Sequence, residues 1–194
     1  WSAYLYPGSD ILRNKLDIRD ERFWEAERFL ARRRAEQLRL GRIAIPRTLD
    51  GEHLKAIHSW LAQDVYDWHG QYRTVTIGKR IDPAEPPRWF ISPTAIEPWL
   101  AGVSEIANSV QWATLDRAEI VERAAELQTY VNFAHPFREM NGRTARIFLE
   151  HVVEPSAFRL DFAKATADQW NAAARGSIPP GLARPSQGPL QFEP

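Results

Sequence analysis

The feature that most constrains the fold of this chain is a pair of apolar stripes on either side of a short polar loop. On both sides the apolar residues recur every three or four positions, which is the period of a helix with one buried face. The stripes consist of Ile120, Ala124, Leu127 and Val131 before the loop and of Ala145, Phe148, Leu149 and Val152 after it. Because a proline disfavours helical geometry in the residue before it, Pro136 predicts that the first helix stops at His135. The sequence therefore predicts two core helices, one ending near Phe133 and the other beginning near Asn141.

The same period predicts three further helices. Their apolar positions are Phe23, Trp24, Leu30, Ala31, Ala35 and Leu38 in the first, Leu54, Ile57, Leu61 and Val65 in the second, and Ile96, Leu100, Val103, Ala107 and Val110 in the third. We expect Gly70 to end the second helix and residues 92–94 to begin the third. A capping box formed by Thr166 and Gln169 predicts one more short helix, ended by Gly176.

One region does not have the helical period. Residues 72–77 have the β-branched character of a short strand. Residues 78–93 follow it, with four prolines and with basic side chains around Trp89 and Phe90. This pattern is typical of an exposed excursion such as a hairpin. The predicted fold class is therefore all-α, with one small β excursion.

The length of 194 residues suits one domain with a single core. We expect this domain to span residues 1–194, with a core from about residue 5 to about 175 and an irregular, proline-containing tail from 178 to 194. The chain begins at Trp1 without an initiator methionine, which indicates a fragment or a processed product.

The composition excludes several classes of function. Lys and Arg total 25 and Asp and Glu also total 25, so no overall field draws the chain to nucleic acid or to an anionic membrane. There is no cysteine, which excludes disulfides and thiolate zinc sites. No apolar run approaches the roughly 20 residues that cross a bilayer. Neither nucleic acid nor a membrane is therefore expected as a partner.

The loop between the two core helices has the composition of an anion site. It lies in the run HPFREMNGRTAR, from His135 to Arg146. Asn141 is a favoured N-cap, and Gly142 lets a ligand approach the backbone, where the N–H groups and the dipole of a helix N-terminus attract anions. Arg143 and Arg146 share one helix face, and arginine suits bidentate contacts with phosphate. Because two arginines in a first turn oppose the helix dipole, this pair favours a bound anion.

Two further side chains extend this interpretation to catalysis. Glu139 lies beside the predicted anion site, and Mg²⁺ in proteins binds one or two carboxylates together with phosphate oxygens. His135 has an unperturbed pKa of about 6.5, which suits a general base at neutral pH. These residues indicate a nucleotide, Mg²⁺ and a proton acceptor. They support equally a helix–loop–helix corner whose polar side chains satisfy one another.

The run 135–146 resembles HPFx[D/E]GNGRxxR, the signature of the Fic family. The matching residues are His135, Pro136, Phe137, Glu139, Asn141, Gly142, Arg143 and Arg146. Met140 is the one departure, at a position where the family usually has glycine and sometimes alanine. Residues 54–75 are similar to the family's helix that leads into its flap, and residues 6–18 are similar to bacterial Fic toxins and to the Fic domains of secreted effectors.

The resemblance implies an all-α core with a β-hairpin flap. It also implies transfer of AMP from ATP to a Tyr, Thr or Ser hydroxyl of a target protein, with release of pyrophosphate. His135 would accept the hydroxyl proton, Glu139 would hold Mg²⁺, and Asn141 and Gly142 would surround the α-phosphate. The two arginines would hold the outer phosphates. Glycine at position 142 and arginine at 146 favour AMP transfer over the γ-phosphate transfer of the Doc branch, which has lysine in place of this glycine.

The flap that the resemblance implies lies at about residues 78–93. In the family, the target segment pairs with the flap as an added strand. The candidate docking residues are Ile77, Lys79, Arg80, Trp89 and Phe90. The basic side chains among them would favour an acidic target surface.

The resemblance also implies partners. In a toxin the target would be a bacterial type II topoisomerase subunit in the bacterial cytoplasm, and in an effector it would be a host small GTPase, reached when a larger protein is secreted into a host cell. Many Fic proteins are restrained by a helix with the motif [S/T]xxxE[G/N], whose glutamate pairs with the second arginine of the signature. Thr48 and Glu52 have this spacing, but His53 follows them. The restraint would then lie either in a separate antitoxin-like protein or in a part of the protein outside this sequence, and we predict the separate antitoxin-like protein.

Met140 leaves an alternative function open. The chain would then be a catalytically weak or inactive Fic module that binds nucleotide or protein, or a Fic enzyme that uses another phosphate-containing donor. In that interpretation the methionine adds a flexible side chain beside the Mg²⁺ ligand. The other histidines do not suggest a metal, because His53 and His58 are five residues apart rather than the four of a metal-binding helix.

Overall fold

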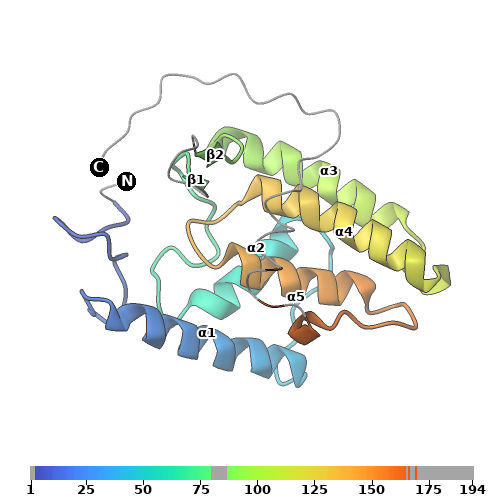
Figure 1. The fold of residues 1–194 in the computed structure, drawn as a ribbon, viewed down its shortest axis with the longest axis horizontal. Helices are drawn as coiled ribbons and strands as arrows, with labels where there is room; N and C mark the ends of the chain where they lie inside the picture. The colour runs from blue at the N-terminus through green and yellow to red at the C-terminus, as the bar shows by residue number, and fades with distance from the viewer. Residues whose placement is uncertain (1–2, 80–86, 165, 167–168, 170–194) are drawn as a thin grey trace.

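Five α-helices form the framework of the part of the chain that the computed structural model describes, namely residues 3–79, 87–164, 166 and 169. The helices are α1 (Arg22–Arg39), α2 (Gly51–Ala62), α3 (Ile96–Ser109), α4 (Arg117–Ala134) and α5 (Asn141–Val153), with short 3₁₀ turns at Pro93–Ala95, Trp112–Thr114 and Phe162–Lys164. Two short strands, β1 (Gly78–Lys79) and β2 (Arg88–Trp89), form a hairpin beside them (Figure 1). The expected all-α fold with a small β-hairpin is confirmed.

Helix α5 lies at the centre of the packing, where it contacts both α2 and α4, while α3 packs on α4 and α1 packs on α2 (Figure 1). All four residues of its predicted stripe are buried, with at most 3% of any of them exposed. Ile147 and Val153 are buried as well, because α5 has neighbours on more than one side. Each of these side chains larger than alanine contributes about 1.5–3 kcal/mol through its burial, so this helix is a firm support for the loop before it.

Helix α4 has a capping box at its start and ends where Pro136 predicts. Asp116 accepts the N–H of Glu119 at 2.9 Å, and the Glu119 carboxylate accepts the N–H of Asp116 at 2.8 Å, which completes a capping box. The helix ends at Ala134, and His135 adopts a left-handed conformation before Pro136. The polar loop therefore leaves the helix abruptly rather than by gradual unwinding.

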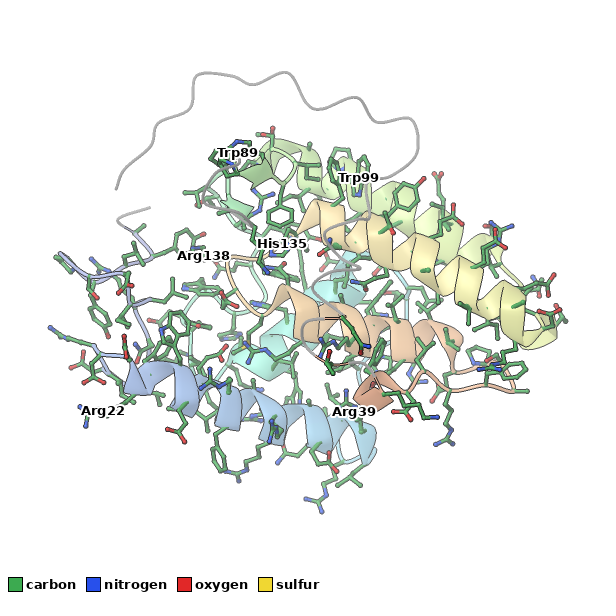
Figure 2. The ribbon with its side chains drawn as sticks, in the orientation of Figure 1. Arg22, Arg39, Trp89, Trp99, His135 and Arg138 are labelled. Carbon is green, nitrogen blue, oxygen red and sulfur yellow. The ribbon has the colours of Figure 1, made fainter. Side chains whose placement is uncertain are left out.

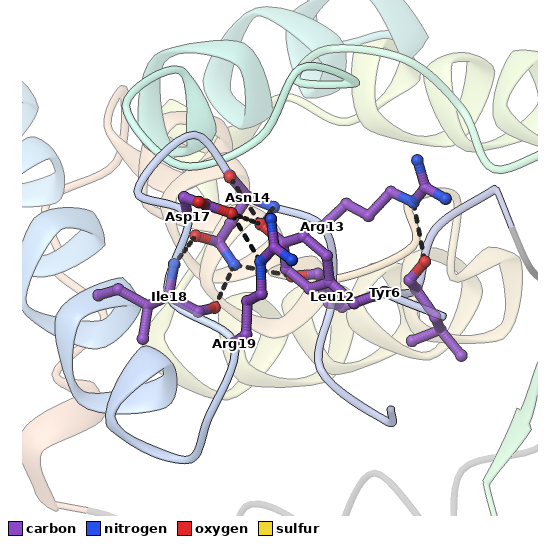
Figure 3. Close-up of polar contacts among 8 residues, drawn as sticks. Tyr6, Leu12, Arg13, Asn14, Asp17, Ile18 and Arg19 are labelled. Carbon is purple, nitrogen blue, oxygen red and sulfur yellow. Dashed lines mark hydrogen bonds and ion pairs between the residues drawn. The ribbon is translucent and has the colours of Figure 1, made fainter. Parts of the chain in front are cut away.

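The segment before α1 is a folded turn that is held together by Asn14 (Figure 3). Its Nδ2 donates to the carbonyls of Leu12 and Ile18, both at 2.8 Å, and its Oδ1 accepts the N–H of Ile18 at 3.2 Å. The N–H of Lys15 donates to the carbonyl of Val65 at 2.8 Å. The turn is thereby docked onto the segment that follows α2.

The expected strand at 72–77 is wrong. Among the described residues, the paired strands of the hairpin lie beyond it, where Gly78 is opposite Trp89 and Lys79 is opposite Arg88. In place of a strand partner, the N–H of Arg73 donates to the carbonyl of Pro136 at 2.9 Å. The β-branched residues thus belong to a connection held against the polar loop. Residues 80–86 of the expected flap lie outside the described residues.

Two other expected boundaries can be compared with the structure. Helix α2 ends at Ala62 rather than at Gly70, although Val65 is buried as the stripe predicted. The Thr166–Gln169 capping box is confirmed, because each residue's N–H donates to the other's side chain, at 2.9 and 3.1 Å. The helix end at Gly176 and the tail at 178–194 lie outside the described residues. In the described part of the chain, every helix is too short or too polar to cross a membrane.

Candidate active site

The polar loop between α4 and α5 is closed by the side chain of Asn141. Its Oδ1 accepts the N–H of Phe137 at 2.8 Å, and its Nδ2 donates to the carbonyl of the same residue at 2.7 Å. The expected N-cap role of Asn141 is therefore wrong: the N-cap position falls on Met140, and Asn141 is the first residue of α5. The amide of Asn141 fixes the shape of the loop, and only its backbone N–H points toward the open end of the helix.

Two residues of the loop have a positive φ although neither is glycine, namely His135 at 40° and Met140 at 61°. A left-handed residue with a side chain costs roughly 1–2 kcal/mol relative to its usual conformation, so the surrounding packing must hold both in place. The conformation at Met140 explains why glycine suits this position in the family signature. The Met140 side chain is only 1% exposed and belongs to the apolar core. It does not extend into the space beside Glu139, which corrects the expectation of a flexible side chain there.

At the other end of the loop, Arg143 forms an ion pair with α1. Its Nη1 and Nη2 donate to the two carboxylate oxygens of Glu27 at 2.9 and 2.6 Å. The Glu27 side chain is 2% exposed, and burial raises its pKa while the nearby Arg143 opposes that rise. Sequence reasoning missed Glu27. The available signal was a carboxylate in the apolar stripe of α1, four residues after Phe23 and four before Ala31.

Glu139 lies beside this ion pair and is partly open to solvent. Its Oε1 accepts the N–H of Met140 at 3.0 Å and is 4.0 Å from Nη2 of Arg143, and 36% of the side chain is exposed. A single accessible carboxylate near a helix N-terminus is compatible with Mg²⁺, which completes its coordination with phosphate oxygens and water. Among the described residues, no group of three or more His, Cys, Asp or Glu side chains forms a metal site without such help.

The first turn of α5 has room for an anion. Gly142 is exposed, and a Cβ placed on it would meet no atom within 4 Å. Arg146 is half-buried further along the helix, and its pKa is lowered by burial and then by the positive charges of Arg143 and Arg39. Because these charges repel one another, a phosphate bound at this end would relieve the repulsion.

His135 lies at the opposite end of the loop, partly buried and on the side of the hairpin that contains Trp89 (Figure 2). Burial, followed by the positive charges of Arg73, Lys79 and Arg138, lowers its pKa to about 3, and a backbone hydrogen bond at Asn132 opposes the shift. The imidazole is therefore neutral at pH 7 and able to accept a proton. Its ring is stacked against another aromatic ring, that of Phe90, with centroids 3.8 Å apart and planes 12° from parallel.

The candidate docking residues of the flap differ in their contacts and in their exposure to solvent. Phe90 contacts His135, and its N–H donates to the carbonyl of Ile77 at 3.1 Å. The Ile77 side chain is 5% exposed, so it packs inward, whereas Lys79 is exposed and Trp89 is partly exposed (Figure 2). Arg80 lies outside the described residues.

A second residue missed by sequence reasoning is Arg73, which is 2% exposed and whose Nε donates to the carbonyl of His135 at 2.8 Å. The sequence around it reads as a short strand, and nothing in that pattern indicates a buried guanidinium group. The contact joins residues 62 positions apart in the chain. It brings the segment before the flap directly against the expected base.

The other histidines have structural contacts. His58 is fully buried, accepts the N–H of Gly70 at 2.9 Å, and stacks on Phe137 with ring centroids 3.9 Å apart. His53 and His151 share a hydrogen bond of 2.9 Å between α2 and α5. Glu52, which has the spacing of the inhibitory motif from Thr48 but is followed by His53, forms an ion pair with Lys55 in the first turn of α2.

Comparisons with known proteins agree with this geometry. Residues 48–153 match the sequence profile of the Fic/DOC family. A protein of Escherichia coli strain K12 that is named probable protein adenylyltransferase Fic is 34% identical over 172 residues, which cover 88% of this chain and 81% of the relative. The protein adenylyltransferase VbhT of Bartonella schoenbuchensis is 31% identical over 88% of this chain, which corresponds to 34% of that longer protein.

Solved structures of Fic proteins also superimpose on this chain. The BepC effector of Bartonella tribocorum, crystallised with AMPPNP, superimposes with a TM-score of 0.81 and 26% identity, covering 94% of this chain and 91% of the effector chain. The N-terminal Fic domain of a Bartonella quintana effector with bound ADP also has a TM-score of 0.81, at 26% identity, over 91% of this chain and 87% of that domain.

Proposed function

The chain belongs to the Fic/DOC family, and on that premise we propose that it is a protein adenylyltransferase, which transfers AMP from ATP to a hydroxyl side chain of a target protein. The observation that carries this proposal is the two-ended loop at 135–140. A neutral imidazole lies at one end and an open, positively charged helix N-terminus lies at the other. A hydroxyl beside the imidazole and a phosphate on the helix would meet between them.

His135 acts as the general base in this reaction. As the hydroxyl oxygen of the target attacks the α-phosphorus of ATP, the proton of that hydroxyl passes to the neutral imidazole. A P–O bond forms to the target, the bond between the α- and β-phosphates breaks, and pyrophosphate leaves. Removing such a base costs on the order of 10² to 10⁴ in rate.

The phosphate groups lie against the start of α5. The backbone N–H groups of Asn141 and Gly142 donate to the α-phosphate, since the amide side chain of Asn141 is already engaged by Phe137. Arg146 and the donors of Arg143 that Glu27 does not use hold the outer phosphates and the departing pyrophosphate. This is catalysis by positioning and by charge stabilisation.

Glu139 is the residue that would hold Mg²⁺. The ion would neutralise phosphate charge and orient the leaving group. The 36% exposure of the Glu139 carboxylate and its position one turn before Arg143 fit this role.

The target protein binds as an extended segment along the flap, where main-chain pairing to β1 and β2 sets its register. Exposed Lys79 favours an acidic target, and Trp89 adds apolar contact area. For the target we keep both classes that the family implies, a bacterial type II topoisomerase subunit in the bacterial cytoplasm and a host small GTPase reached by secretion. A separate antitoxin-like protein, whose glutamate pairs with Arg146, is the proposed restraint.

Labelled ATP tests the proposal. Bacterial and host lysates are each incubated with the chain, Mg²⁺ and ATP carrying label at the α-phosphate, and a parallel reaction uses label at the γ-phosphate. Protein labelling from α-labelled ATP alone, lost in His135→Ala, is the expected result. Labelling from the γ-phosphate alone indicates a kinase, and ATP binding without labelling in either lysate indicates a binding module. Met140, the feature that left a binding module open, is buried in the core and offers that alternative no support at the site.

A further inference from the structure

Arg73 is the largest of the fully buried side chains, and its guanidinium group donates only to backbone carbonyls in the contacts described. Nε donates to His135 at 2.8 Å, and Nη1 donates to Val75 at 2.8 Å. Nη2 donates to Ile91 at 2.5 Å and to Ala134 at 3.2 Å. One planar group thus reaches four carbonyls.

These carbonyls come from two functional parts of the molecule. Val75 and Ile91 lie at the bases of the two arms of the flap, just before β1 and just after β2. Ala134 and His135 form the end of α4 and the start of the loop that contains the expected base. The backbone N–H of Arg73 adds the bond to Pro136, the next residue of that loop. Arg73 therefore connects both arms of the flap to the loop through the hydrogen bonds of one residue.

In the part of the chain that the structure describes, the charge of Arg73 is not matched by an acidic side chain. Within the described residues, no carboxylate lies within ion-pair distance of it. A buried cation costs several kcal/mol unless polar groups surround it. The four carbonyls and the negative end of the α4 dipole provide that environment. Lysine, with a compact ammonium group, cannot reach carbonyls spread around a planar fork in the same way.

A second contact fixes the imidazole ring itself. Phe90, the residue before Ile91, is stacked on His135. The backbone of His135 is strained, with φ at 40°, and Arg73 holds its carbonyl. Both the ring and the main chain of the base are thereby connected to the flap.

We infer that Arg73 is a positioning residue that couples the flap to His135, so that a target segment seated on the flap and the base that deprotonates it keep a fixed geometry. This inference rests on the proposed function for its catalytic meaning. The mechanical coupling itself rests on the four carbonyl contacts and the Phe90 stack.

Amide hydrogen exchange tests the coupling without any activity. Arg73→Met removes the donors and keeps the aliphatic stem. We expect the amides of residues 75–79 and 88–92 and those of the loop at 134–141 to lose protection together, while the amides of α3 and the middle of α5 keep theirs. Arg34→Met is the matched control, because Arg34 is a half-buried arginine bound to Asp64 and stacked on Trp60, with no hydrogen bond or ion pair to the described residues of the flap or the loop.

Transfer kinetics test the catalytic meaning. The rate of protein labelling from α-labelled ATP is measured in a lysate across ATP concentrations and pH. A displacement of reacting groups by about 1 Å costs on the order of 10²-fold, so Arg73→Met should lower the maximal rate by about that factor with little change in KM for ATP. The acidic limb of the pH profile should move to higher pH, because a positive charge near His135 is lost while those of Lys79 and Arg138 remain.

Two further variants separate charge from geometry. Because lysine keeps the positive charge, Arg73→Lys should return the acidic limb of the pH profile to its position in the parent chain. It should not restore the maximal transfer rate that Arg73→Met lowers. Phe90→Leu should lower the rate while leaving the exchange protection of residues 75–79 intact. Flap and loop amides that stay protected in Arg73→Met would overturn the inference, and so would equal effects of Arg73→Met and Arg34→Met on rate and exchange. If the parent chain labels no protein, the proposed function fails, and the exchange pattern alone decides whether the coupling is present.

Discussion

The two ends of the loop at 135–140 are built in opposite ways. At the His135 end, a buried cation binds only carbonyls, an aromatic ring covers the imidazole, and the base stays neutral. At the α5 end, Arg143 is bound between the carboxylates of Glu27 and Glu139, next to open space over Gly142. A general base must be in its neutral form before it reacts, whereas a phosphate site needs positive charge that a ligand can reach. The short loop keeps these two environments adjacent but separate.

The largest expected effects are on the transfer rate and on ATP affinity, and they come from one substitution at each end of the loop. His135→Gln leaves a side chain that cannot take up a proton, so the maximal rate of α-label transfer should fall by about 10² to 10⁴, with Mg²⁺–ATP affinity close to that of the parent. Arg146→Ala should instead weaken the binding of Mg²⁺–ATP, with little change in the pH dependence of the transfer rate. Titration calorimetry with Mg²⁺–ATP and labelling rates measure both. Equal effects of the two variants on affinity would contradict the division between the ends.

The next largest effect is on stability at the α5 end. Glu27→Ala leaves the guanidinium of Arg143 without its buried partner, and removal of one member of a buried pair costs about 3–5 kcal/mol. Because Arg143 is 32% exposed and can rehydrate, we expect the lower end of that range. Urea unfolding measures the change. Glu25→Ala on the same helix is the control, because Glu25 is exposed and should change the unfolding free energy by less than about 0.5 kcal/mol.

A smaller expected effect is a dependence of the unfolding free energy on pH, which comes from four histidines whose pKa is lowered by burial. Burial lowers the pKa of His53 and of His151 to about 4, and that of His58 and of His135 to about 3. As pH falls below about 6.5, the unfolded chain binds protons that the folded chain does not, so stability is complete above that pH and is lost as pH falls toward 4. Each such histidine contributes a slope of up to about 1.4 kcal/mol per pH unit.

Urea unfolding at pH 7.5, 6 and 5 measures this slope. His58→Asn keeps an acceptor for the N–H of Gly70 and should reduce the slope by the contribution of one proton, whatever its effect on the stability at pH 7.5. A stability that does not change between pH 7.5 and 5 would show that these histidines are protonated in the folded chain.

The sequence predicted the helices and the loop because both depend on local signals. Periodic apolar residues, Pro136 and the capping box at Thr166 act within a few residues. The strand at 72–77 failed because the segment is held by Arg73, which binds carbonyls up to 63 residues away. The Glu27–Arg143 pair joins residues 116 positions apart. Its signal in the sequence is an acidic residue within the apolar stripe of α1. Contacts of this range depend on the packed fold, which no local pattern encodes.

Met140 should give the smallest effect on transfer. Its left-handed backbone suits glycine, so Met140→Gly relieves roughly 1–2 kcal/mol of strain, but it also empties a core position, where loss of such a side chain costs about 2–5 kcal/mol. We expect a modest net loss of stability and an unchanged labelling rate at saturating ATP and 25 °C, because the side chain lies in the core and not beside Glu139. Met140→Leu, which keeps the volume and the strain, is the control and should match the parent in rate. A large gain in rate for Met140→Gly alone would show instead that the left-handed strain at Met140 is transmitted to Glu139 and restrains the phosphate end of the loop.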